Sequence, residues 1–377
     1  MTQALIQSAL THLRALVAMD TRFQVGELSR EEGVLAYMME ALGPDFHYTF
    51  TGDGESSLGL LAVRGDRPRH LFCAQLNTSH EGGEWKSSPL ELTISDGIAT
   101  GLGVVDCKGG CAALVTALQN SSRDVAVFFS LDVRPRSMTS VMHLLEERLL
   151  QRHDSIEFVF CTEPTCGSAV VEHRGLVMCT GYFNGVAGHA SQARALVDSA
   201  VHEAMRWGIR ALEYASEHQR HTTYDALKGI CFNLGKIEGG KSPSLIADHA
   251  VVKWAMRPLP SQDPLYMSRQ VCELASRPWR VRWEYRHVMP ALPAFRPGHV
   301  LDEVLDATRK YLARYSIFIG APVDFWTSAA LFSEKGYLAC ALGPGQISQA
   351  GTPNEWVRVS ELDQCLMSYL YLIDEER

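Results

Sequence analysis

The apolar positions of the first half of the chain alternate between a helical period and short unbroken runs. Over 1–23 and 31–42, leucine, isoleucine, valine and methionine recur near helical spacing, which predicts two helices. Apolar runs typical of strands follow at HYTF, LGLLAV, HLFCAQL, DVAVFFSL and IEFVFCT, with helical stretches at 109–119 and 140–151. Strands alternating with helices of this length predict an α/β sheet, largely parallel at its centre.

The pattern changes near residue 175. A strand LVMCTGYFNG, a long helix, two strands (GICFNLGKIEGG and HAVVKWAMRPLP) and a helix near 266–276 suggest a β-α-β-β-α-β order. Several prolines mark the end of this block. After it, a helical pattern over 301–315, the apolar run YLACALGPG and a last helix over 360–373 again fit an α/β domain. We therefore expect a discontinuous α/β domain, 1–174 with 290–377, interrupted by an inserted α+β domain, 175–289.

Composition narrows the class of protein. Of 377 residues, 46% are hydrophobic and 21% charged, as in ordinary globular chains. The net charge of −8, with no Lys/Arg run, argues against a nucleic-acid partner. The ten cysteines show no CxxC pair or zinc-ribbon spacing, which favours free thiols in a reducing compartment. Because no apolar run approaches the roughly 20 residues of a membrane span and the N-terminal helix does not read as a signal peptide, we expect a cytoplasmic protein with no membrane partner.

Six phrases follow one another in order: GLGVVDCKGGCAAL, CTEPT, EHRGLV, GVAGHAS, MRPLP and ALGPGQISQAGTPNEW. Together they resemble the acetylornithine deacetylase and succinyl-diaminopimelate desuccinylase family of metallo-aminoacylases, most of all its N-acetylcitrulline deacetylase branch. The resemblance covers nearly the whole chain. It implies the two-domain aminoacylase-type fold, a catalytic-type α/β domain carrying a ferredoxin-like dimerisation domain. It also implies amide hydrolysis by a water on two divalent metals, zinc or cobalt, with a carboxylate as general base.

The positions that the family uses for this chemistry are mostly substituted. Its His-x-Asp pair falls on Gln75 and Asn77, its Glu-Glu pair on Val133 and Arg134, and its late histidine on Gly351. Two acidic ligands remain, at Asp106 and Glu163. Both histidine ligands and the general base, whose position is Val133, are thus missing.

These substitutions predict a degenerate site without metal or other cofactor. A glutamine amide is a poor zinc ligand, glycine has no side chain, and valine cannot accept a proton. Arg134 puts a permanent positive charge where a ligand carboxylate is expected, and like charges about 4 Å apart cost roughly 4 kcal/mol at an effective dielectric near 20. Our hypothesis is that Arg134 replaces the metals and pairs with Asp106, Glu163 or both; the alternative is a surface arginine.

The resemblance also implies groups that bind the substrate. His189 in GVAGHAS matches a histidine that reaches the partner's site and stabilises the oxyanion, and Arg257 in MRPLP matches an arginine that holds an α-carboxylate. The alternatives are a histidine that supports a turn and an arginine at a strand end. The family's asparagine falls on Ser244, and an acid expected within Thr327–Ala329 is absent.

Two classes of function stay open. The first is a metal-free, non-hydrolytic homologue, a pseudoenzyme that keeps a cleft for a small N-acylated amino acid, as a homodimer or as a heterodimer with a competent paralogue. The second is an enzyme: a one-metal hydrolase with zinc or cobalt on Asp106, Glu163 and His80, or new chemistry around Asp106, Arg134 and Glu163. A nucleophile built from Cys107 and His173 has no further support in the sequence.

Overall fold

The computed structural model describes residues 2–23, 32–52, 57–132, 138–147, 150 and 153–375. The chain divides into two compact units, Met1–Val171 with Asp302–Gly320 and Thr327–Arg377, and Glu172–Leu301 with Ala321–Trp326. The division into functional domains after residues 174 and 289 stays a prediction.

Unit 1 is built on a six-stranded sheet whose four neighbouring strands β6, β3, β7 and β16 are parallel. Antiparallel β2 and β1 extend it at one edge. The order is β1 (His47–Thr51), β2 (Ser57–Arg64), β6 (Val125–Asp132), β3 (His70–Gln75), β7 (Phe158–Cys161) and β16 (Leu338–Ala341). Every residue of β2, β6 and β7 is buried, as expected for strands covered on both faces. The predicted α/β class is confirmed.

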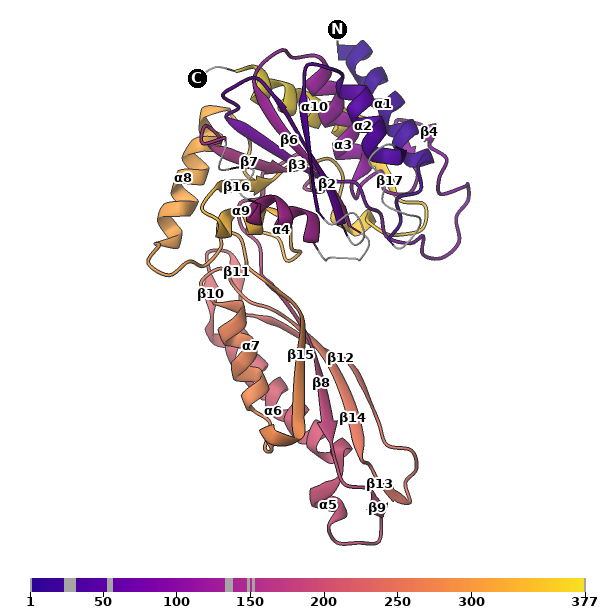
Figure 1. The fold of residues 1–377 in the computed structure, drawn as a ribbon, viewed down its shortest axis with the longest axis vertical. Coiled ribbons are helices and arrows are strands. Elements are labelled where there is room, and N and C mark those ends of the chain that lie inside the picture. The colour runs from indigo at the N-terminus through magenta and orange to yellow at the C-terminus, as the bar shows by residue number, and fades with distance from the viewer. Residues whose placement is uncertain are drawn as a thin grey trace. The chain divides into compact units, whose positions relative to one another are not determined.

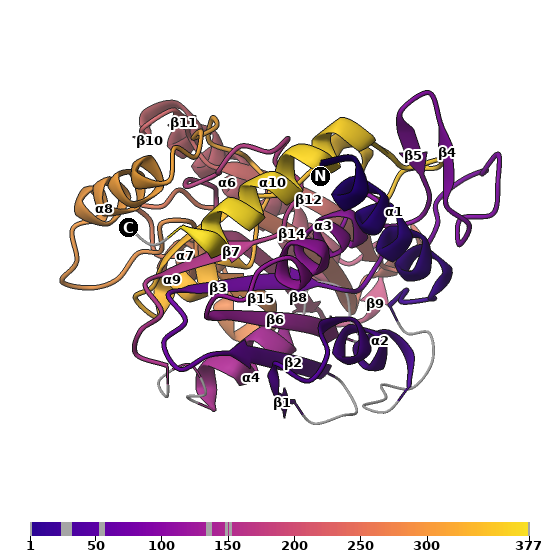
Figure 2. The same cartoon turned by 90° about the horizontal axis from the view of Figure 1, so that it is seen from above.

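Helices cover both faces of this sheet (Figure 2). One layer packs around α3, and the other face carries two short helices that contact β2, β6, β7 and β16. The first layer is α1 (Thr2–Ala18), α2 (Gly33–Leu42), α3 (Lys108–Gln119) and α10 (Val359–Asp374), and the second is α4 (Thr139–Glu146) and α9 (Ala329–Glu334). In α8 (Leu301–Arg314), Tyr311 stacks on Phe158 of β7. A small three-stranded sheet consists of β17 (Trp356–Arg358), β5 (Ile98–Thr100) and β4 (Thr93–Ser95). The short 3-10 helix η3 (Ile347–Gln349) precedes β17 in the chain.

The first helix was predicted too long. It ends at Ala18 rather than near residue 23, because the chain turns there and pairs with the segment after β3. Thr78 donates its N–H to the carbonyl of Thr21, and Phe23 donates to that of Thr78. Likewise, α4 ends at Glu146, short of the expected residue 151. None of the helices in the described ranges is long and apolar enough to cross a membrane.

Unit 2 is an antiparallel four-stranded sheet with two helices on one face (Figure 1). The sheet order is β12 (Cys231–Gly239), β14 (His249–Arg257), β8 (Leu176–Asn184) and β15 (Val281–Met289), and the helices are α6 (Ala200–His221) and α7 (Pro264–Glu273). Trp207 of α6 is fully buried in the core between them. The chain order β8-α6-β12-β14-α7-β15 confirms the predicted ferredoxin-like arrangement.

Short elements flank this sheet. Beyond the β8/β14 end, β9 (Gly188–His189) pairs with β13 (Leu245–Ile246), and α5 (Ala195–Asp198) follows. The remaining elements are β10 (Thr223–Tyr224), β11 (Leu227–Lys228) and η2 (Pro278–Arg280).

Candidate functional site

Asn77, at the carboxyl end of β3, is committed to a contact within the protein. Its Nδ2 donates to the backbone carbonyl of Asp132 at 2.7 Å, and its Oδ1 accepts from the backbone N–H of Asp132 at 2.6 Å. The side chain is 5% exposed, so both amide groups are used. Only an amide supplies this donor and acceptor pair. Asn77 therefore ties the end of β3 to the end of β6.

Asp132 continues this network. Its carboxylate accepts from the backbone N–H and the Oγ of Ser140, both at 3.0 Å. The next residues, 133–137, lie outside the described part of the chain, so the pairing expected for Arg134 and the place of Val133 stay predictions. Their sequence, VRPRS, contains no histidine, cysteine or acid that could ligate a metal.

Asp106 and Glu163, the two retained acids, lie close enough to influence each other. The side chain of Glu163 is half-buried. Its burial is the larger cause, and the charge of Asp106 the second cause, of a rise in the pKa of Glu163 to about 8. A backbone hydrogen bond with Ser328, in the Thr327–Ala329 pattern, acts in the opposite direction. Glu163 is thus mostly protonated at neutral pH.

Glu355 also belongs to this site, although the sequence patterns did not single it out. It is 1% exposed and accepts from the N–H of Val105 at 2.8 Å, of Asp106 at 3.1 Å and of Gly351 at 3.3 Å. Burial raises the pKa of Glu355 to about 7, the backbone bonds oppose this, and the charge of Asp106 adds to it. The only signal in the sequence was an acid inside the phrase QAGTPNEW.

Gly351 occupies the position of the late histidine in a backbone conformation that disfavours any side chain. Its φ is +66°, in the left-handed region. A Cβ there would lie 3.1 Å from the Oγ of Ser79, tighter than an ordinary contact. The loop as it stands thus favours glycine at this position.

A buried lysine, Lys108, lies within the electrostatic reach of Glu355 and Asp20. Its side chain is fully buried, and its Nζ donates to the carbonyl of Met19 at 2.9 Å. Burial lowers the pKa of Lys108 to about 8, while negative charge on Asp20 and Glu355 acts in the opposite direction. The sequence patterns did not point to this role.

The weaker candidates do not gather into a displaced site. Glu81 binds Arg22 through both of its oxygens at 2.5 Å, and His80 is exposed. Cys107 donates its thiol to the carbonyl of Asn77 at 3.1 Å, and burial raises its pKa well above the ordinary value, which leaves no thiolate nucleophile. His173 belongs to unit 2.

In unit 2, the structure brings His189 and Ser244 together and separates them from Arg257. β9 pairs His189 with Leu245, and Ala190 donates its N–H to the carbonyl of Ser244 at 3.0 Å. Arg257 ends β14, eight residues from His249 at the end near β9, which is about 26 Å at about 3.3 Å per residue (Figure 1). One small ligand cannot contact both groups of a single chain.

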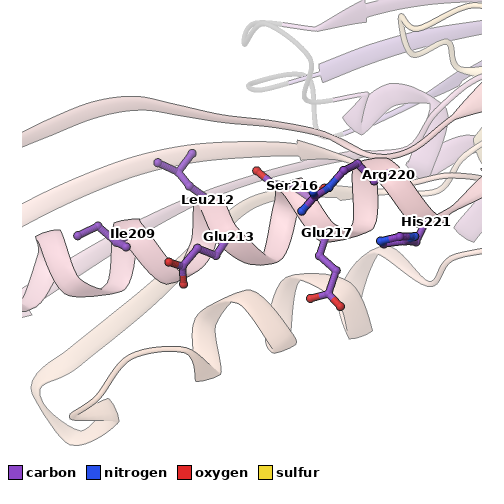
Figure 3. Close-up of a pocket in the computed structure, with 7 residues that line it drawn as sticks. All are labelled: Ile209, Leu212, Glu213, Ser216, Glu217, Arg220 and His221. Carbon is purple, nitrogen blue, oxygen red and sulfur yellow. The ribbon is translucent and has the colours of Figure 1, made fainter.

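An open groove of about 600 Å³ runs along α6, and no predicted site residue lines it (Figure 3). It is lined by Ile209, Leu212, Glu213, Ser216, Glu217, Arg220 and His221. Because all seven come from one face of a single helix, this groove is an exposed surface of α6 and not a cleft between elements, and we place the candidate site at the strand ends of unit 1 instead.

Comparison with known proteins identifies the family. The chain is 34% identical over 370 residues to the N-acetyl-L-citrulline deacetylase of Xanthomonas campestris, covering 98% of each chain. It belongs to the acetylornithine deacetylase and succinyl-diaminopimelate desuccinylase family. The acetylornithine deacetylase of Photorhabdus laumondii is 24% identical over 353 residues, 90% of this chain and 89% of that protein. Residues 171–280 match the peptidase dimerisation domain. A putative aminohydrolase from methicillin-resistant Staphylococcus aureus has the same fold, with a TM-score of 0.73 at 12% identity over 99% of this chain and 98% of that one.

By the resemblance, the described residues hold only part of the ligand set that the family's metal pair requires. Within the described ranges, no group of three or more His, Cys, Asp and Glu side chains is arranged to hold a metal ion. Two of the expected ligand positions are Gln75, a neutral amide, and Gly351, which has no side chain. Of the acids nearby, Glu355 is used by backbone N–H groups.

Proposed function

We propose that this chain is a metal-free, non-hydrolytic homologue of the N-acetylcitrulline and N-acetylornithine deacetylases that binds a small N-acylated amino acid. The observation that carries the proposal is the reciprocal hydrogen-bond pair between Asn77 and Asp132. A residue that has merely lost a ligand function leaves its side chain without a defined partner. Here the replacement side chain has acquired a structural role that the family's aspartate could not fill, since a carboxylate donates no hydrogen bond.

Arg257 is the group that we expect to recognise the ligand. Its guanidinium is suited to a bidentate contact with an α-carboxylate, which every N-acylated amino acid carries. His189 and Ser244 lie at the small β9/β13 pair, beyond the opposite end of β14. We therefore propose that His189 serves the ligand held by a second copy, or by a competent paralogue, so that the complete site needs two chains.

An exposed apolar surface of unit 2 supports such a dimer. Met205, Ile209 and Leu212 recur on the outer side of α6 and are about half exposed, and Figure 3 shows two of them. The neighbouring strand β12 is the edge of its sheet, so its outer hydrogen-bonding groups are available for another strand. We propose that α6 and β12 together form the contact between copies.

The test combines metal content, turnover and ligand binding. The purified chain would be analysed for bound metal and assayed with N-acetyl-L-citrulline and N-acetyl-L-ornithine under added zinc or cobalt. We expect substoichiometric metal, no turnover, and an increase in Tm with one of the two ligands. Arg257→Ala should abolish that increase, whereas Arg269→Ala, which removes an exposed arginine of α7, should preserve it.

The alternative is a zinc- or cobalt-dependent deacetylase with a divergent site, and it draws on the full-length similarity to a citrulline deacetylase. Near-stoichiometric metal together with turnover would establish it and overturn our proposal. Turnover without metal would instead indicate new chemistry at the acids of the site. Failure of both ligands to raise the Tm would exclude the proposed binding role for these two compounds.

A further inference from the structure

The ring of His189 is held by its neighbour two residues on. Its Nδ1 lies 2.7 Å from the Oγ of Ser191 and accepts the backbone N–H of Ser191 at 3.2 Å. A backbone N–H can only donate, so the nitrogen that faces it must present a lone pair. In the neutral ring the proton is then on Nε2.

The backbone around the ring is also fixed. His189 pairs with Leu245 across β9 and β13, Ala190 donates to Ser244 at 3.0 Å, and Gln192 donates to the carbonyl of His189 at 3.1 Å. The side chain itself is exposed. With Nδ1 turned to Ser191 and the backbone anchored, the Nε2–H group is the part of the ring that remains available to a ligand.

From this geometry we infer that Ser191 is a positioning residue, which keeps Nδ1 of His189 as an acceptor and so presents Nε2–H as the donor of the ring. The inference rests on the proposed function in one respect, the role of His189 toward a ligand. An N–H donor selects an acceptor oxygen, such as an acyl carbonyl, and offers nothing to an ammonium group, which has only donors. Ser191 thereby favours a ligand that presents an acyl carbonyl, rather than an ammonium group, to this ring.

The experiment reads the tautomer directly. In the full-length protein labelled with ¹⁵N-histidine, two-bond and three-bond ¹H–¹⁵N correlations distinguish a protonated from an unprotonated ring nitrogen, and His189→Gln assigns the resonance. We expect Nε2–H in the unmodified chain and in Ser191→Thr, which keeps the hydroxyl. In Ser191→Ala the backbone N–H stays and only the hydrogen bond donated by the hydroxyl is lost, so the Nδ1–H form should rise by at most about fivefold, the equilibrium equivalent of one neutral hydrogen bond.

Ligand binding supplies the second readout. The affinity for N-acetyl-L-citrulline should fall a few-fold in Ser191→Ala and recover in Ser191→Thr. Ser360→Ala, the same change at an exposed position of α10 in unit 1, should leave both the tautomer and the affinity unchanged. An Nδ1–H ring in the unmodified chain, or an unaltered tautomer in Ser191→Ala, would overturn the inference. Because the tautomer is measured without ligand, absent binding would count against the proposed function alone.

Discussion

Asn77 and Asp132 join the ends of two parallel strands through a closed pair of hydrogen bonds, Nδ2 to O at 2.7 Å and N to Oδ1 at 2.6 Å. Both residues are buried. By the resemblance, the family has an aspartate at this position that orients or tunes a metal ligand. In this chain the amide fastens the end of β3 to the end of β6.

An aspartate at position 77, the residue that the resemblance places there, should lower the free energy of unfolding. In Asn77→Asp, the carboxylate can still accept from the N–H of Asp132 but faces its carbonyl without a hydrogen to donate. We expect a loss of about 1–3 kcal/mol in the free energy of unfolding, measured by urea denaturation. The exposed Asn184→Asp, at the end of β8, is the matched control and should change little. Equal stability of the two variants would contradict a structural role for the amide.

Gly351→His should likewise be destabilising rather than restorative. A side chain at φ +66° costs on the order of 1–3 kcal/mol, and its Cβ meets Ser79. Gly351→Ala separates the backbone cost from that of the imidazole. As a control, Gly208→Ala in α6 has only an ordinary contact at 3.5 Å and should be neutral or stabilise by up to about 1 kcal/mol. A fully stable Gly351→His that binds zinc would show that the loop can still accommodate the family's ligand.

Protonation of His70 should lower the free energy of unfolding of this protein in acid. This side chain is 5% exposed, its Nε2 lies 2.9 Å from the hydroxyl of Tyr311, and burial lowers its pKa to about 4. The unfolded chain takes up the proton near pH 6.5, so the contribution of His70 is complete above that pH and is lost as the pH falls toward 4. The loss should reach about 3 kcal/mol. The difference in unfolding free energy between the unmodified chain and His70→Gln should therefore vary with pH across this window; a constant difference would exclude a buried neutral histidine.

Negative charges introduced on the outer side of α6 should dissociate the proposed dimer. Ile209→Asp combined with Leu212→Asp places two carboxylates on the proposed contact, where burial without partners is costly. Light scattering should then give the mass of one chain rather than two. Phe318→Asp, a similar change at a 74% exposed residue of unit 1, should leave the dimer intact. A dimeric double variant would place the contact elsewhere.

Much of the site could be anticipated from the sequence because its parts sit in ordered phrases. The ends of β3 and β7 were recognisable from their buried apolar runs, which placed Asn77 and Glu163 at the same edge of the sheet. The sequence did not predict the roles of Glu355 and Lys108, because these roles depend on backbone groups that distant segments supply. A pattern of hydrophobic positions carries no information on such contacts.

The sequence by itself determined the class of fold, the insertion of an α+β unit and the list of substituted ligand positions, because periodicity and local phrases are properties of neighbouring residues. Only the tertiary structure decided what the substitutions do. Asn77 finds Asp132 fifty-five residues away, Gly351 adopts a left-handed backbone beside Ser79, and β14 separates Arg257 from His189. Such partners follow from the register of strands and the packing of loops, which no local pattern specifies.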